Sequence, residues 1–214
     1  MRRSQMHTQS SQRRNSNDDH DHSSGLAGMG RAPKNTSATK LDLSMCGLRD
    51  LPDEATKYLN ARELILSSNQ ITSLSGSRLQ AFAATLRVLE LAWNQLGALP
   101  AEVGQLALLE ALALPFNKLT TLPPELGRCK HLKNIQANDN QIQYLPEQLG
   151  GCVSLTTLNL EYNRLEDLPR ALGGLPRLAA AGLAGNPLSG IPTDVQLGGA
   201  LALRAHLRAR SGGR

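Results

Sequence analysis

The amino-acid sequence predicts an α/β solenoid, a stack of about seven short coils that each add one strand to a curved parallel sheet. Three observations predict it. A Leu-rich text repeats at a nearly constant period, each copy holds one fixed polar anchor, and aromatic residues make up only 3% of the chain. So few large rings favour a thin stacked core filled by Leu side chains over a globular core.

The repeat is anchored by one polar position per copy, and successive anchors are spaced by 23, 25, 23, 23, 23 and 23 residues. The anchors are Cys46, Asn69, Asn94, Asn117, Asn140, Asn163 and Asn186. Around each anchor the sequence follows the pattern LxxLxLxxNxLxxLP, with substitutions. Self-similarity at this period is the signature of coils that bury their apolar faces only against their neighbours. The predicted repeats lie near 38–60, 61–85, 86–108, 109–131, 132–154, 155–177 and 178–196.

Each part of the repeat predicts one element. The alternating LxL segment predicts a short strand whose Leu side chains face the core and whose intervening side chains face the concave side. The Asn amide both donates and accepts hydrogen bonds, so stacked copies should form an Asn ladder at the turn. The Pro and Gly of LPxxLG predict 3₁₀ or short helical turns on the convex side. The two extra residues of the second spacing fall within 75–86 and predict a longer outer helix with Phe82 buried.

The ends of the chain differ from the repeats. Helical spacing predicts a capping helix at 197–208, with Leu203 and Leu207 covering the last coil. The repeat domain is therefore expected at 36–208, between disordered polar tails at 1–35 and 209–214. The N-terminal segment has no apolar core of a secretory signal, and no run of 18 apolar residues exists. We expect no signal peptide and no membrane insertion.

The net charge of +5 comes from the flanks. Leu41 to Gly199 holds 12 Lys and Arg against 15 Asp and Glu, a net charge of −3, so the flanks carry +8. Nucleic-acid binding needs basic side chains gathered on the folded surface. We therefore do not expect a nucleic-acid partner, and binding through the basic tails is the least favoured function.

Cysteine and histidine usage predicts neither disulfides nor a metal site. Cys129 and Cys152 occupy equivalent positions in successive coils; a bridge between them is an alternative, but we interpret them as buried reduced thiols. This interpretation indicates a reducing, cytoplasmic location. The five His show no ligand spacing with Cys, and no P-loop, GxSxG or HExxH pattern occurs. We expect no catalytic residues, cofactor, metal or small-molecule substrate, and no enzyme activity.

The LxxLxLxxNxLxxLP pattern and its LPxxLG linking text resemble the leucine-rich-repeat superfamily over about Thr39 to Arg208. The 23-residue form is similar to the intracellular Ras-group repeats. The resemblance implies the solenoid described above and a non-catalytic scaffold or adaptor that binds a partner protein, in intracellular signalling of the Ras type. The alternative is a structural subunit of a larger assembly, such as a cytoskeletal or ciliary complex. We expect a monomer or one subunit of a hetero-complex.

The alternation of the strands predicts which residues meet that partner. Outward positions of the second repeat are Glu63, Ile65, Ser67 and Ser68. The third and fourth repeats form an apolar centre of Val88, Ala92, Trp93, Ala111, Ala113, Pro115 and Phe116, beside the polar fifth and sixth repeats. An aromatic centre with a polar rim is typical of a protein interface. The predicted protein-binding residues are Glu63, Val88, Glu90, Trp93, Ala113, Phe116, Gln136, Asp139, Asn159, Glu161 and Tyr162.

Overall fold

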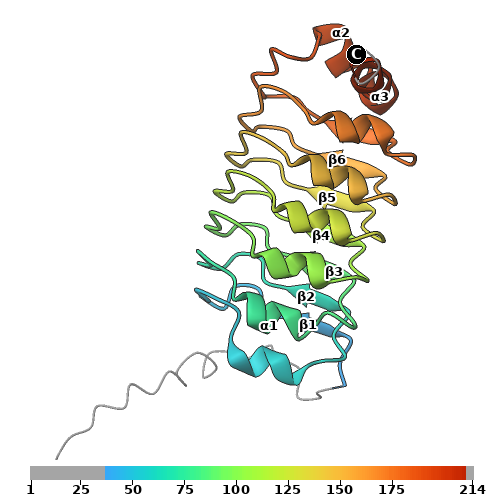
Figure 1. The fold of residues 1–214 in the computed structure, drawn as a ribbon. Coiled ribbons are helices and arrows are strands. Elements are labelled where there is room, and N and C mark those ends of the chain that lie inside the picture. The colour runs from blue at the N-terminus through green and yellow to red at the C-terminus, as the bar shows by residue number, and fades with distance from the viewer. Residues whose placement is uncertain (1–36, 211–214) are drawn as a thin grey trace, which may run out of the picture.

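The computed structural model describes residues 37–210 as a curved stack of successive coils. Figure 1 shows the helical segments forming one column of the stack and the strands another, with the C-terminal helices closing one end. The tail predicted at 1–35 and residues 211–214 of the tail predicted at 209–214 lie outside these residues. No helix within residues 37–210 is both long and apolar enough to cross a membrane.

The strands form one parallel sheet whose order follows the sequence, β1 to β7. Parallel pairing in sequence order is what a right-handed coil with one strand per turn produces. The central strand residues face the core: Leu64 pairs in register with Leu89, and Leu89 with Leu112. The predicted curved sheet of seven repeats is confirmed. The strands are β1 (Lys40–Asp42), β2 (Glu63–Ile65), β3 (Val88–Glu90), β4 (Ala111–Ala113), β5 (Asn134–Gln136), β6 (Thr157–Asn159) and β7 (Ala180–Gly182).

The return segments are short helices, as the LPxxLG text predicted. Pro precedes the 3₁₀ helices with an extended backbone, and Gly recurs inside most of them. Gly127 is needed because a Cβ there would collide with the carbonyl oxygen of Gln148 in the next coil. Gly at this position therefore sets how closely the coils stack. The helices are η2 (Asp53–Lys57), α1 (Gly76–Gln80), η3 (Ala101–Gln105), η4 (Pro124–Arg128), η5 (Glu147–Gly151) and η6 (Arg170–Gly174).

The second coil corrects one prediction. The two extra residues do not lengthen the outer helix, because α1 has five residues like its neighbours. They are taken up instead by turns at 81–85 that follow α1. Phe82 lies in these turns and is fully buried, as predicted. The coil holds an α-helix in place of the 3₁₀ helix of the other coils, since its text lacks the Pro and Gly of LPxxLG.

The C-terminal cap consists of two helices where one was predicted at 197–208. They are α2 (Thr193–Leu197) and α3 (Gly199–Ala209), and the chain turns between them at Gly199, whose φ is +69°. Leu203 and Leu207 of α3 are buried, as predicted. Residues 209 and 210 had been placed in the disordered tail, but Ala209 ends α3 and Arg210 donates to both carboxylate oxygens of Asp167, at 2.7 and 2.6 Å. This ion pair fastens the cap to the sixth coil.

Candidate protein-interaction surface

The Asn side chains build the turn from which the concave surface begins. Asn140 Oδ1 accepts from the backbone N–H of Leu119, while its Nδ2 donates to the carbonyl oxygens of Leu114 and Ala137. Each bond is 3.0 to 3.2 Å long, and two of the three reach into the preceding coil. The same pattern holds for Asn69, Asn94, Asn117, Asn163 and Asn186.

Cys46 begins this ladder without extending it. Its thiol donates to the carbonyl oxygen of Ser44 within its own coil, at 3.3 Å. Its backbone N–H donates to Asn69 Oδ1 at 3.0 Å, so the Asn ladder of the second coil is hydrogen-bonded to the first coil at this position.

The residue immediately before each anchor has a left-handed backbone. Its φ lies between 54° and 58° in six coils and is +73° at Gly185 in the seventh. This conformation costs roughly 1–2 kcal/mol for a residue with a Cβ, and it persists where surrounding bonds fix it. Here the Asn hydrogen bonds on both sides fix it. We call these seven residues the left-handed row: Met45, Ser68, Trp93, Phe116, Asp139, Tyr162 and Gly185.

Aromatic side chains of the left-handed row lean toward the next coil. The rings of Trp93 and Phe116 are stacked, with centroids 3.8 Å apart and planes 11° apart. The ring of Tyr162 lies over Gly185, where a Cβ would come within 2.5 Å of Tyr162 Cδ1. Trp93 and Tyr162 remain about 60% exposed, and Phe116 is 36% exposed. The row therefore presents an exposed aromatic pair and a separate aromatic ring along one edge of the strands.

The other predicted residues lie in rows across the strands. Glu90, Ala113, Gln136 and Asn159 follow one another in register across β3 to β6. Glu63 pairs with Val88 in the row beside them. Asp139 and Tyr162 belong to the left-handed row, and Glu161 precedes Tyr162. All eleven predicted residues are half-buried or exposed, so the structure brings them together on one concave surface.

One outward position was predicted wrongly. Ile65 was expected on the open face but is only 8% exposed. Its register neighbours are Asp42 on β1 and Glu90 on β3, one on each side. Ile65 therefore adds little apolar surface to the second coil.

A small hollow lies at the centre of the sheet, above β4. Its volume is about 150 Å³. It exists because β4 presents only the methyl groups of Ala111 and Ala113, while both neighbouring strands present longer side chains. We call it the β4 hollow; its lining is Val88, Glu90, Ala111, Leu112, Ala113, Asn134 and Gln136.

The sequence did not single out Asn134, which lies at this hollow. Its Oδ1 is buried and has no hydrogen-bond partner among the described residues. The alternation of the strand predicted that Asn134 faces outward. That its oxygen is buried depends on the side chains of the neighbouring coils, which no single repeat reveals.

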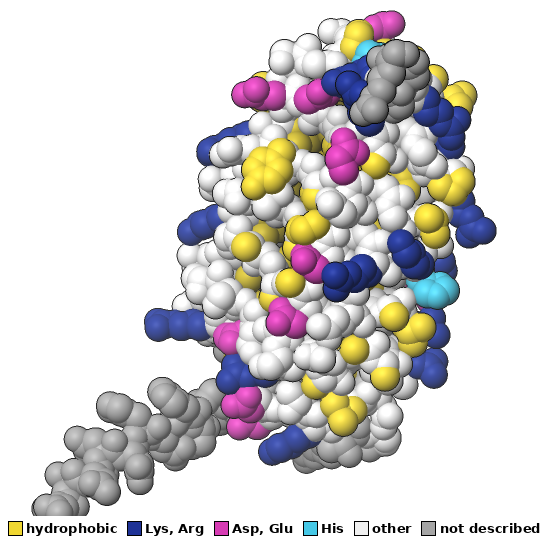
Figure 2. Space-filling view, in the orientation of Figure 1, with side chains coloured by type: hydrophobic (Ala, Val, Ile, Leu, Met, Phe, Trp, Pro, Cys, Tyr) yellow, Lys and Arg dark blue, Asp and Glu magenta, His cyan; other side chains and the backbone are white. Residues whose placement is uncertain are grey.

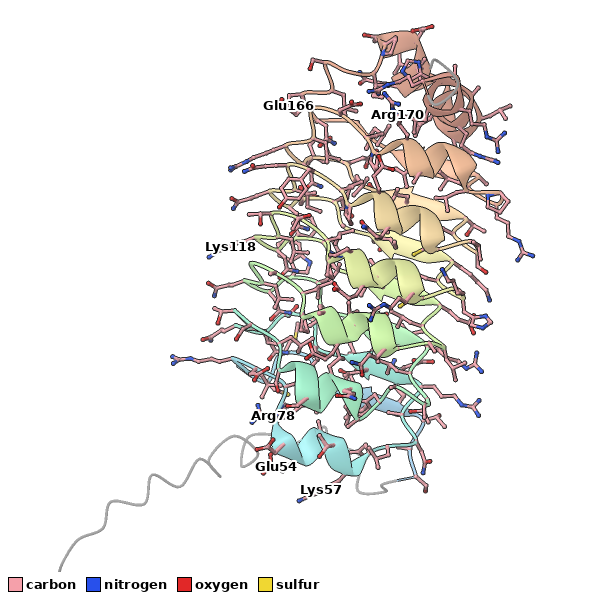
Figure 3. The ribbon with its side chains drawn as sticks, viewed as in Figure 1. Glu54, Lys57, Arg78, Lys118, Glu166 and Arg170 are labelled. Atoms are coloured by element: carbon pink, nitrogen blue, oxygen red, sulfur yellow. The ribbon has the colours of Figure 1, made fainter. Side chains whose placement is uncertain are left out.

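The convex face has a different character, because its charges pair between coils. Arg78 of α1 points toward η2 in Figure 3 and donates to Asp50 at 2.9 Å and to Asp53. Charges also pair between coils directly before the strands: Glu110, which precedes β4, binds Lys133 and Arg87, and these hydrogen bonds hold the pKa of the Glu110 carboxyl below its usual range.

Basic side chains of this face are dispersed. Figure 2 views the face with the helical column, where Lys and Arg lie mainly along the two margins with other side chains between them. Such a distribution offers no continuous basic track for a phosphate backbone on the face in view.

Comparison with known proteins identifies the repeat. Family models described as leucine-rich repeat match residues 107–165 and 83–99. Among solved structures, a leucine-rich-repeat protein of Leptospira interrogans is 30% identical with a TM-score of 0.64, covering 70% of this chain. The ectodomain of the Arabidopsis thaliana receptor kinase GASSHO1/SCHENGEN3 is 30% identical with a TM-score of 0.58, covering 64% of this chain. The leucine-rich-repeat domain of the type III effector XopL is 23% identical with a TM-score of 0.62, covering 79% of this chain.

These neighbours are of different lengths. This chain spans 38% of the Leptospira protein, 17% of the plant ectodomain and 67% of the XopL domain. The likeness therefore concerns the repeat array and its sheet.

Proposed function

The chain has the leucine-rich-repeat fold, and from that premise we propose that it is a non-catalytic adaptor that binds a partner protein on its concave face. The observation that carries the proposal is the stacked, exposed pair Trp93–Phe116, which lies three residues beyond Glu90 and Ala113 of the β4 hollow. Binding energy at protein interfaces concentrates in a few aromatic and Arg side chains near the centre of the contact. The surrounding polar side chains then exclude water.

The arrangement of side chains fits that description. The apolar centre is formed by the aromatic pair with Val88 and Ala113. Around it lie half-buried or exposed polar residues that can form hydrogen bonds with a partner while they remain accessible to water. These rim residues are Glu63, Glu90, Gln136, Asp139, Asn159, Glu161 and Tyr162.

A solved neighbour with the same fold was determined together with a binding partner. The plant receptor ectodomain was determined in complex with CASPARIAN STRIP INTEGRITY FACTOR 2. Leucine-rich-repeat domains generally serve as protein-interaction modules, which supports the same class of function for this chain. It supports no particular partner, because the identity of the ligand rests on side chains and not on the fold.

We extend the proposal to intracellular signalling of the Ras type, with the protein located in the cytoplasm. The 23-residue repeat supports the first part. The second is supported by Cys129 and Cys152, which are free buried thiols that donate to the carbonyl oxygens of Val103 and Leu126. In this role the protein acts as a monomer that exchanges between partners.

A structural-subunit role is the second candidate, as in a cytoskeletal or ciliary complex. It is favoured by the cap, where Leu197 and Leu201 are 83% and 79% exposed. These two exposed Leu side chains, one at the end of α2 and one in α3, can give the molecule a second apolar contact, remote from the concave sheet. A subunit that uses both faces would be held permanently in its hetero-complex.

Quantitative affinity purification with mass spectrometry tests the proposal. The bait variants are wild type, Trp93→Ala/Phe116→Ala, and the matched control Tyr144→Ala/Val153→Ala, whose residues are also exposed but lie outside the strands and the left-handed row. We expect one or a few proteins to be lost with the first variant and retained with the control. If both variants keep the same set, the concave face is not the binding site.

The same experiment separates the two candidate roles. A third bait, Leu197→Ser/Leu201→Ser, removes the apolar contact on the cap. Loss of additional proteins with this bait, together with complete co-fractionation of the chain with its complex, would favour the structural subunit. An adaptor keeps its partners in this variant and is found partly free.

A further inference from the structure

We propose that the β4 hollow receives an arginine side chain of the partner, held between the carboxylate of Glu90 and the Oδ1 of Asn134. This inference rests on the proposed function, since it names the group that the concave face recognises. It is carried by three features of the hollow: its shape, an unsatisfied acceptor and an unpaired charge.

The shape comes from β4. Ala111 and Ala113 flank Leu112 there, and Leu112 forms part of the lining while remaining in the core. In register beside them, β3 presents Val88 and Glu90. On the other side, β5 presents Asn134 and Gln136, so longer side chains surround two methyl groups. The space of about 150 Å³ is large enough to admit the end of one side chain from a partner.

The unsatisfied acceptor is Asn134 Oδ1, which is buried without a hydrogen-bond partner. Buried polar atoms are almost always bonded, because desolvation without a bond costs free energy. Within residues 37–210 only two other side-chain polar atoms are in this condition, Arg204 Nε and His206 Nε2, and both belong to the cap helix α3. On the concave sheet, therefore, the one such atom lies at the hollow. An N–H donor that enters the hollow can hydrogen-bond to Asn134 Oδ1 and so offset the free-energy cost of its desolvation.

The unpaired charge is Glu90. In the part of the chain that the structure describes, its carboxylate forms no ion pair, whereas the neighbouring Glu63 lies 3.9 Å from Lys40. The concave rows are acidic as a whole, since Lys40 is their one basic residue. Their acidic residues are Asp42, Glu63, Glu90, Asp139 and Glu161. A cationic group is therefore complementary to the hollow and to the surface around it.

Geometry favours arginine over lysine. Glu90 and Asn134 stand on the two strands that flank β4 and are offset by two residues in register, so their backbones are roughly 12 Å apart. A guanidinium carries five N–H donors in a planar fork and can bond acceptors on two sides at once. An ammonium group is a compact charge that approaches one acceptor at a time. The Trp93–Phe116 pair follows the same two strands β3 and β4, and guanidinium planes stack well on such rings.

Heteronuclear NMR of the full chain, titrated with N-acetyl-L-arginine amide as the probe, tests the proposal. We expect saturable shifts of the Ala111 and Ala113 methyl groups and of the Asn134 side-chain amide. N-acetyl-L-citrulline amide has nearly the same shape without the charge, and we expect it to bind at least fivefold more weakly. N-acetyl-L-lysine amide should also bind more weakly than the arginine probe.

Variants locate the probe. Ala113→Leu fills the hollow and should abolish the saturable shifts at Ala111, while its backbone spectrum reports that the fold is intact. Glu90→Gln should weaken the probe at least fivefold. The matched control Glu166→Gln removes an exposed acid outside the strands and the left-handed row and should change the affinity less than twofold. Asn134→Asp should tighten binding at least threefold, because it adds a charge at the same position.

The results that overturn the inference are distinct from those that overturn the proposed function. Absence of saturable shifts at Ala111 and Ala113, or equal losses in Glu90→Gln and Glu166→Gln, would show that the hollow does not select arginine. If Trp93→Ala/Phe116→Ala still loses its partner, only the arginine inference fails. If that variant keeps every partner, the proposed function fails whatever the titration shows.

Discussion

The indole ring of Trp93 stacks on the phenyl ring of Phe116, and both residues hold the same left-handed backbone in successive coils. The repeat brings them together because equivalent positions of neighbouring coils lie about one strand spacing apart. The pair is a surface feature, since Trp93 is 58% exposed. A large apolar pair that is kept exposed in a strained conformation fits a recognition role better than a structural one.

If the pair is not part of the core, removing it should cost little stability. Trp93→Ala should lower the free energy of unfolding by about 0.5–1.5 kcal/mol, the worth of an aromatic pair. The control Leu89→Ala, in the same coil but fully buried, should cost about 2–5 kcal/mol. Urea unfolding followed by circular dichroism measures both. Equal losses in the two variants would mean that Trp93 is a structural residue.

The Asn ladder predicts a larger effect at a polar residue. Asn140→Ala leaves the N–H of Leu119 without its acceptor, and the carbonyl oxygen of Leu114 loses one of its two donors and keeps Asn117 Nδ2. The free energy of unfolding should therefore fall by roughly 1–3 kcal/mol. Cys46→Ala is the control, because the Cys46 thiol bonds only within its own coil and should cost less than about 1 kcal/mol. Urea unfolding followed by circular dichroism measures the free energy of unfolding of both variants. An Asn140→Ala variant with an unchanged free energy of unfolding would show that water replaces the hydrogen bonds of the ladder.

These two predictions mark what the sequence could and could not provide. The period and the LxL alternation were sufficient for the seven strands, the register and the ladder, because each is a property of one repeat copied along the chain. The hollow above β4 and the burial of Asn134 Oδ1 without a hydrogen bond depend on which side chains of neighbouring coils lie next to each other. Ile65 was misplaced for the same reason, since its exposure depends on the neighbouring strands, which carry Asp42 and Glu90 in register with it. The cap was only partly predicted because it lies outside the repeat.

Gly185 should tolerate no side chain. Its φ of +73° strains any residue with a Cβ, and a methyl group there would press on the Tyr162 ring. We expect Gly185→Ala to lower the free energy of unfolding by about 1–2 kcal/mol. Gly97→Ala is the matched control, because nothing lies within 4 Å of the added methyl and its φ is not positive. Thermal unfolding of both variants checks this, and equal melting temperatures would refute the role of Gly185.

Stability should depend on pH through the two buried thiols. Burial raises the pKa of Cys129 to about 11 and, with the nearby Cys129, that of Cys152 to about 12. In the unfolded chain both ionise near pH 8.5, so their contribution is complete below that pH and is lost as pH rises toward 11. The free energy of unfolding should fall by roughly 1.4 kcal/mol per pH unit per thiol in this window.

A double variant isolates this effect from other groups that titrate at high pH. Cys129→Ala/Cys152→Ala should show a shallower loss of stability between pH 8 and pH 10 than the wild type. Urea unfolding at both pH values measures the difference. Identical slopes in the two proteins would mean that the thiols are not shielded in the folded state.

The most direct test of the central claim is the affinity of the captured partner, measured by isothermal titration calorimetry with wild type and Trp93→Ala/Phe116→Ala. The account predicts that the double variant keeps its fold and loses about 2 kcal/mol or more of binding free energy, roughly a thirtyfold rise in Kd. The control Tyr144→Ala/Val153→Ala should bind as the wild type does. A folded double variant with unchanged Kd would contradict the assignment of the concave face as the binding site.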